Sequence, residues 1–98
     1  MKYLFLTFLL FVNLYGAARG VVNSDYYACT LKEYCNDMEV FTKLGDIKNM
    51  AQYIKRGKCI QTKKGMTITV INLSNDLMFE FVYDGSKYWT YSKTVTIN

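Results

Sequence analysis

The sequence of 98 residues contains no histidine. Histidine is the commonest general base in enzymes, a frequent zinc ligand and an essential member of every imidazole triad. The chain also has no glycine-rich loop that would hold a phosphate, no cluster of metal ligands and no calcium-binding loop. We therefore expect no enzymatic activity, no cofactor and no bound metal.

The remaining groups that could support catalysis are one cysteine and a few carboxylates. Cys35 would need activation by a lysine or a helix terminus, and its expected position inside a helix argues against that. The carboxylates of Glu33, Asp37 and Glu39 fall on the solvent side of the same predicted helix, where charged rows are usually hydrated surface. Neither set changes the expectation of a non-enzymatic protein.

Long apolar runs are scarce, and the one clear example lies at the N-terminus. Lys2 precedes an apolar stretch over residues 3–12, and small residues follow it at positions 16–18 and 20. This run is nearer a dozen residues than the ~20 that a membrane span needs. The pattern predicts a cleavable signal peptide over residues 1–20, cut after Ala18 or after Gly20, and we favour the second.

The expected mature chain, residues 21–98, is a single domain, with no later stretch of membrane-spanning length. We expect it to be periplasmic or secreted. Cleavage after Gly20 removes Lys2 and Arg19, which leaves 10 basic and 8 acidic side chains and a net charge of +2. This weak field does not favour nucleic acid as a partner. A chain this short buries only about 60% of its unfolded surface, so its core is marginal without a cross-link.

Cys29, Cys35 and Cys59 all lie in the expected mature chain. An exported compartment permits disulfides, and three cysteines allow three single pairings that the sequence does not decide. We favour Cys29 with Cys59, because this bond would tie the helical stretch to the strand region and stabilise the fold by about 3 to 4 kcal/mol. Cys35 is then either a small buried residue or a reactive thiol that links two chains into a dimer.

The first half of the mature chain shows the apolar spacing of helices. One stripe consists of Leu31, Cys35, Met38 and Phe41, and the next consists of Ile47, Met50, Ala51 and Ile54. Thr30 and Glu33 form a capping-box pair for a first helix over residues 31–43. Asp46 is the expected N-cap of a second helix that ends at Arg56. The pattern predicts two short antiparallel helices.

From Lys58 onward the apolar period changes to two. The predicted strands cover residues 58–62, 66–72, 77–83, 88–92 and 94–97. Asp84 and Gly85 suit the two left-handed positions of a type I′ hairpin turn. Short strands joined by tight turns most simply close into a small barrel. The predicted fold is therefore α+β, with two short N-terminal helices followed by a five-stranded antiparallel barrel.

Several short motifs in the second half of the chain resemble a known family. They are Gly57 and Cys59, Lys64 and Gly65, the MTITVIN strand, the Asp84–Gly85 turn and Tyr88–Trp89. Together they look like a bacterial SH3-like domain, and in particular like small exported bacterial proteins with a disulfide-tied helical segment. Cys35 departs from that pattern, which needs two cysteines. The resemblance implies the barrel and export, and members mostly have no assigned activity.

Two features are candidates for binding. Basic residues gather between positions 55 and 64, and of these Lys63 and Lys64 could contact an anionic surface, although they could also serve only to solubilise a turn. Aromatic residues gather between Tyr83 and Tyr91, and the resemblance implies an aromatic groove that receives a peptide or glycan. We expect Trp89 and Tyr91 in the core, and Tyr88, with Tyr83, at the binding surface.

These observations favour an exported, non-enzymatic module that binds a protein or a cell-envelope component. A small inhibitor or immunity protein that blocks an exported enzyme fits the same features, and so does a secreted toxin or effector. The sequence does not separate the first two classes.

Overall fold

The computed structural model describes residues 17–73 and 77–98. Two strands come first, β1 (Ala18–Val22) and β2 (Tyr26–Cys29), and two helices follow, α2 (Lys32–Leu44) and α3 (Ile47–Lys55). The later strands are β3 (Cys59–Thr62), β4 (Thr67–Asn72), β5 (Met78–Tyr83), β6 (Ser86–Tyr91) and β7 (Val95–Ile97), with a short 3-10 turn, η1 (Ser92–Thr94), before the last. The helices therefore lie in the middle of the described chain.

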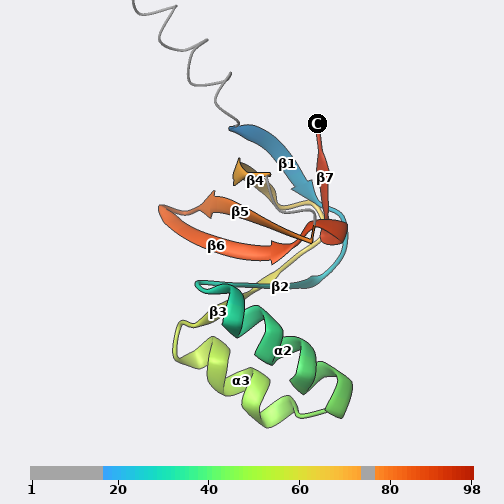
Figure 1. Cartoon of the computed structure of the whole chain (residues 1–98), viewed down its shortest axis with the longest axis vertical. Helices are drawn as coiled ribbons and strands as arrows, with labels where there is room; N and C mark the ends of the chain where they lie inside the picture. Colours follow the sequence, from blue (N-terminus) through green and yellow to red (C-terminus); the bar gives the residue numbers. More distant parts are fainter. Residues whose placement is uncertain (1–16, 74–76) are drawn as a thin grey trace, which may run out of the picture.

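The strands form one seven-stranded antiparallel sheet in the order β3-β2-β6-β5-β4-β1-β7. In Figure 1 the two helices stand at the end of the sheet where β2 and β3 run, and β1 and β7 lie at the other end. The predicted fold is wrong: the helices are not N-terminal, the sheet has seven strands rather than five, and it is not closed into a barrel. The physical reason is that β1 pairs on both sides, with β4 and with β7, and that β3 and β7 are left as edges.

The two strands that were not predicted, β1 and β2, lie within residues 18–29, for which the sequence predicted no strand or helix. β1 contains residues 18–20, which fall within the predicted signal peptide, while residues 1–16 of that prediction lie outside the described residues. β2 is buried along most of its length, so it lacks the alternation of apolar and polar residues that marks a strand. Its pairing with β3 runs from Tyr26 opposite Thr62 to Cys29 opposite Cys59.

The helical hairpin matches the prediction closely, except at its first cap. The backbone of Gly45 is left-handed at the end of α2, and the Asp46 side chain accepts a hydrogen bond from the backbone N–H of Asn49 at the start of α3. The predicted capping box is wrong, because Leu31 is the N-cap of α2 and makes no side-chain cap. Thr30 instead donates its hydroxyl to the carbonyl of Lys58, which joins the start of the hairpin to its end.

The first of two buried clusters is almost entirely aliphatic and comes from the strands. We call it the sheet core; it consists of Val22, Ala28, Ile68, Val70, Phe81 and Val95. The β5–β6 hairpin supplies its largest side chain, Phe81. Asp84 and Gly85 both have positive φ angles, 51° and 79°, which confirms the predicted turn between these strands.

The second cluster lies between the helices and the sheet. We call it the helix core; it consists of Tyr27, Cys29, Cys35, Met38, Cys59 and Met78. Cys29 and Cys59 form a disulfide across the paired strands β2 and β3, which confirms the predicted pairing. The Cys35 thiol is 0% exposed and donates to the carbonyl of Trp89 at 3.1 Å, and burial raises its pKa to about 12. Its predicted role as a small buried residue is therefore confirmed.

Candidate functional site

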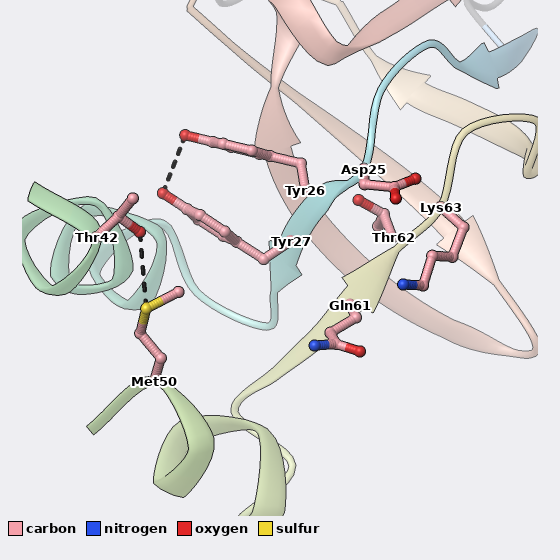
Figure 2. A pocket seen from close by; sticks show the side chains of 8 residues that line it. All are labelled: Asp25, Tyr26, Tyr27, Thr42, Met50, Gln61, Thr62 and Lys63. Atoms are coloured by element: carbon pink, nitrogen blue, oxygen red, sulfur yellow. Dashed lines mark hydrogen bonds between the residues drawn. The ribbon is translucent and has the colours of Figure 1, made fainter. Parts of the chain in front are cut away.

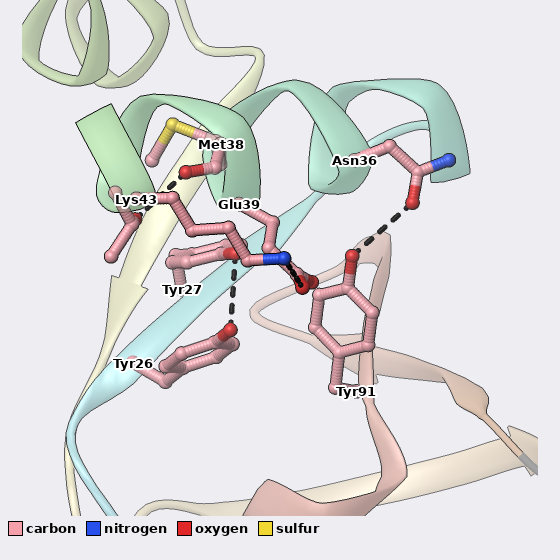
Figure 3. Close-up of polar contacts among 8 residues, drawn as sticks. Tyr26, Tyr27, Asn36, Met38, Glu39, Lys43 and Tyr91 are labelled. Carbon is pink, nitrogen blue, oxygen red and sulfur yellow. Dashed lines mark hydrogen bonds and ion pairs between the residues drawn. The ribbon is translucent and has the colours of Figure 1, made fainter. Parts of the chain in front are cut away.

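Three tyrosines meet where α2 crosses the sheet. The rings of Tyr26 and Tyr27 stack with centroids 4.1 Å apart, and Tyr91 of β6 meets both edge-on at 6.0 and 6.4 Å. Tyr27 donates its hydroxyl to that of Tyr26 at 3.1 Å, and burial first, then this hydrogen bond, raises the pKa of Tyr27. Figure 3 shows the three rings below α2, with their hydroxyls turned toward the helix. We call this group the tyrosine cluster.

The hydroxyl of Tyr91 connects the cluster to polar side chains of α2. It donates to the Asn36 side-chain oxygen at 3.2 Å, and the carboxylate of Glu39 lies close enough to compete for the same proton. Hydrogen bonding from Tyr91 holds the pKa of Glu39 below its usual value, and Lys43, whose ammonium lies 3.4 Å from Glu39, adds to this effect. Glu39 is therefore ionised near neutral pH, and Figure 3 shows its carboxylate beside the Lys43 ammonium.

A groove runs along Tyr91 between α2 and the end of β6. Two adjoining hollows of about 300 and 310 Å³ share Glu39 and Tyr91 as walls. We call them together the α2–β6 groove; its residues are Asn36, Glu39, Val40, Lys43, Leu77, Tyr91, Ser92 and Lys93. Val40 is 51% exposed and Leu77 is 74% exposed, so each of the two hollows has an exposed apolar side chain in addition to the shared Tyr91.

A separate cleft of about 250 Å³ lies on the other side of the tyrosine cluster. Figure 2 shows Tyr26 and Tyr27 lining it between Met50 of the helical hairpin and a polar end formed by Asp25, Thr62 and Lys63. The Asp25 carboxylate accepts the backbone N–H of Lys64 at 2.9 Å. The Thr62 hydroxyl is buried and has no hydrogen-bond partner among the described residues.

Lysine side chains cover several of the aromatic rings. The Lys93 ammonium lies 5.9 Å from the rings of both Tyr26 and Tyr91, and that of Lys32 lies 4.4 Å from Trp89. Lys58 lies over Tyr34 and Tyr53 at 4.9 and 4.6 Å. Such contacts are worth about 0.5 to 1 kcal/mol at exposed sites. The lysines therefore join the helices and η1 to the aromatic surface and leave positive charge beside the groove.

The structure separates the residues that the sequence analysis proposed for binding. Tyr88 packs against the sheet core with its ring 5.8 Å from that of Phe81, and Tyr83 is 39% exposed beside the β5–β6 turn. Lys63 lines the cleft beside Tyr26 and Tyr27, and Lys64 is exposed in the next turn. These four residues therefore do not form one surface.

Both faces of β6 are packed, because each faces a different core. Tyr88 contacts the sheet core, while its neighbour Trp89 contacts the helix core. Tyr91 also packs against the helix core, yet it reaches the groove. Sequence reasoning assigned only one face of this strand to a core, since it did not place the helices over the other face.

The sequence analysis missed Tyr26, Tyr27 and Glu39 as members of a site. Tyr26 and Tyr27 are adjacent aromatic residues shortly before Cys29, a pattern that is typical of a buried strand. Glu39 was assigned to the hydrated face of α2, and nothing in the local sequence indicates that Tyr91, far along the chain, reaches it.

Over residues 17–73 and 77–98, no group of three histidine, cysteine or acidic side chains is arranged to hold a metal ion. Within the same ranges, no helix is both long and apolar enough to cross a membrane. Comparisons of the chain with protein-family models, with curated protein sequences and with solved structures gave no match.

Proposed function

We propose that this protein is an exported, non-enzymatic binding module that holds a protein partner in the α2–β6 groove. The observation that carries the proposal is the groove itself, whose two hollows share Tyr91 and are lined by the exposed apolar side chains of Leu77 and Val40 respectively. Tyrosine is enriched at protein interfaces because its ring gives apolar contact area and its hydroxyl gives a directional hydrogen bond.

The charges around the groove support a protein partner over a purely anionic surface. Glu39 lies within the groove as an ionised acceptor, and Lys43 and Lys93 lie at its borders. A surface with apolar rims, one carboxylate and two ammonium groups resembles the mixed composition of a transient protein interface. A layer of anionic lipid headgroups would match the ammonium groups but would leave Glu39, which pairs with Lys43, and the exposed apolar side chains of Val40 and Leu77 without a complementary group.

Export is supported by the apolar N-terminal run and by the disulfide. The Cys29–Cys59 bond closes a segment with a sequence separation of 30, and such bonds persist in oxidising compartments. The non-enzymatic assignment is supported by the absence of histidine from the sequence and by the state of Glu39, whose lowered pKa makes it a poor general acid near neutral pH.

The proposal is tested by capture with matched variants. The exported chain is immobilised and exposed to the extracellular or periplasmic fraction of its source, and the retained protein is identified by mass spectrometry. Val40→Asp should lose that protein by at least about ten-fold, since one charge in an apolar rim costs more than about 1.4 kcal/mol of binding. The control is Ile47→Asp, which changes an exposed apolar residue on α3 outside the groove and should keep the capture unchanged.

Three results would contradict the proposal. Equal capture by wild type and Val40→Asp would exclude the groove as the binding surface. Retention of a lipid or glycan in place of a protein would exclude the partner class. Hydrolysis of peptide, glycan or phosphoester substrates by the purified chain, abolished by Glu39→Gln, would exclude the non-enzymatic assignment.

A further inference from the structure

β1 is an interior strand of the sheet. Its residues pair with β4 on one side, from Ala18 opposite Val70 to Val21 opposite Thr67, and with β7 on the other. Figure 1 shows β1 beside both strands. The two peptide bonds that the sequence offers for signal-peptide cleavage, after Ala18 and after Gly20, both fall within this strand.

Cleavage after Gly20 would remove most of the contact between β1 and β4. Of the residues that pair with β4, only Val21, opposite Thr67, would remain. The loss would uncover the backbone of Ile68 and Val70, which belong to the sheet core, and would remove the Arg19 carbonyl that accepts the Asn98 N–H at 3.0 Å. Unpaired buried backbone groups are costly, so the shorter chain would form a weaker sheet. Cleavage after Ala18 would remove a single pair.

Gly20 has a packing reason to be small. A Cβ atom at this position would lie 2.9 Å from Cγ1 of Val95 and 3.3 Å from Cγ2 of Val70, so a larger side chain would collide with the sheet core. The glycine is therefore explained by the folded domain and needs no explanation from peptidase recognition. Gly16 and Ala18 then remain as the small residues at positions −3 and −1 of a cleavage site.

We propose that the processed bond is Ala18–Arg19 and that the mature chain begins at Arg19. This inference rests on the proposed export. A peptidase of the signal-peptidase class would add water across the bond, which leaves a carboxylate on Ala18 and an ammonium group on Arg19. Because the bond lies in an interior strand of the folded sheet, cleavage precedes the folding of β1.

The test uses the full chain, expressed in a bacterial secretory host, and the intact mass of the exported product. A mass that begins at Arg19 is the expected result. A mass that begins at Val21 would overturn this inference and leave the proposed export in place. A chain that stays uncleaved in the cell or its membrane would overturn both.

A pair of variants tests the same bond independently. Gly16→Leu places a large residue at position −3 of the Ala18–Arg19 bond. The product that begins at Arg19 should therefore be lost, whereas a bond after Gly20, with Ala18 at position −3, would be unaffected. Gly16→Ala keeps a small residue there and should be processed as the wild type is. An undiminished product of Gly16→Leu that begins at Arg19 would contradict the assignment.

Discussion

The two cores of this protein differ in the kinds of groups that hold them together. The sheet core contains five aliphatic side chains and one phenylalanine, and it depends on close packing. The helix core contains two paired cysteines, one free thiol, two methionines and a tyrosine. A covalent bond joins two of its members, and its thiol and its tyrosine hydroxyl donate hydrogen bonds to the neighbouring Trp89 carbonyl and Tyr26 hydroxyl.

This difference indicates which of the two cores lies beside the candidate binding surface. The six side chains of the sheet core are all apolar, so this core contributes close packing. The helix core borders the tyrosine cluster, and Tyr91 belongs both to its periphery and to the α2–β6 groove. We therefore expect sequence changes in the sheet core to act on stability, and changes around the helix core to act on stability and binding together.

The largest effect is expected from emptying the sheet core. Phe81→Ala should lower the free energy of unfolding by about 3 to 5 kcal/mol, because a fully buried aromatic ring leaves a cavity. Tyr83→Ala, on the same strand but exposed, is the control and should cost less than about 1 kcal/mol. Both are measured by denaturant unfolding. Similar losses for the two variants would show that the sheet core does not dominate stability.

The second effect concerns the bond that is unique to the helix core. Replacing both Cys29 and Cys59 with alanine should cost about 3 to 4 kcal/mol, since the closed segment regains chain entropy when it unfolds. Hydrogen exchange should show α2 and α3 losing protection while β4 and β5 keep theirs. A uniform loss of protection across all elements would contradict the division into two cores.

The third prediction concerns two buried threonines, whose replacement by valine should change the free energy of unfolding in opposite directions. Thr62→Val should stabilise the protein by about 1 kcal/mol, because the Thr62 hydroxyl is buried without a partner. Thr90→Val should destabilise it by a similar amount, because the Thr90 hydroxyl donates to the carbonyl of Tyr27 at 2.9 Å. Thermal melts of both variants test the pair. Destabilisation by Thr62→Val would mean that its hydroxyl has a partner in solution.

The smallest effect is a pH dependence at the groove. The folded pKa of Glu39 is lowered, first by the Tyr91 hydroxyl, so its contribution to stability is present above the unfolded value of about 4.3 and is lost as pH falls through the folded pKa. Glu39→Gln should therefore cost at most about 0.5 kcal/mol at neutral pH and nothing in strong acid, since Glu39 and Tyr91 are both partly exposed to solvent. An equal cost at both pH values would contradict the role of the charge.

Local signals in the sequence predicted the helical hairpin and the later strands well. Asp46 as a cap, the Asp84–Gly85 turn and the Cys29–Cys59 bond follow from rules that act over a few residues or from the order of elements. β1 and β2 were missed for physical reasons. The small residues of β1 match a peptidase pattern, and β2 is buried on both faces, which removes its period.

The candidate site was harder to predict, because it depends on contacts between distant segments. Tyr91 meets Glu39 and Asn36 only after α2 has packed across β6. Tyr88 was expected at the surface, but its register opposite Phe81 turns it toward the sheet core. Alternation along β6 indicated which side chains share a face, but it could not indicate that both faces are covered.

The pairing of β1 with β7 also has a consequence for the order of folding. Gly20 lies opposite Ile97, so the sheet cannot be completed until nearly the whole described chain is available, whereas the helical hairpin needs only its own residues. During synthesis the side of β1 that pairs with β7 therefore stays unpaired until β7 has been made. Such long-range pairing slows folding, and in that interval β1 presents Gly20, Val21 and Val22 along an unpaired edge. Self-association of the chain is favoured most while this edge is open.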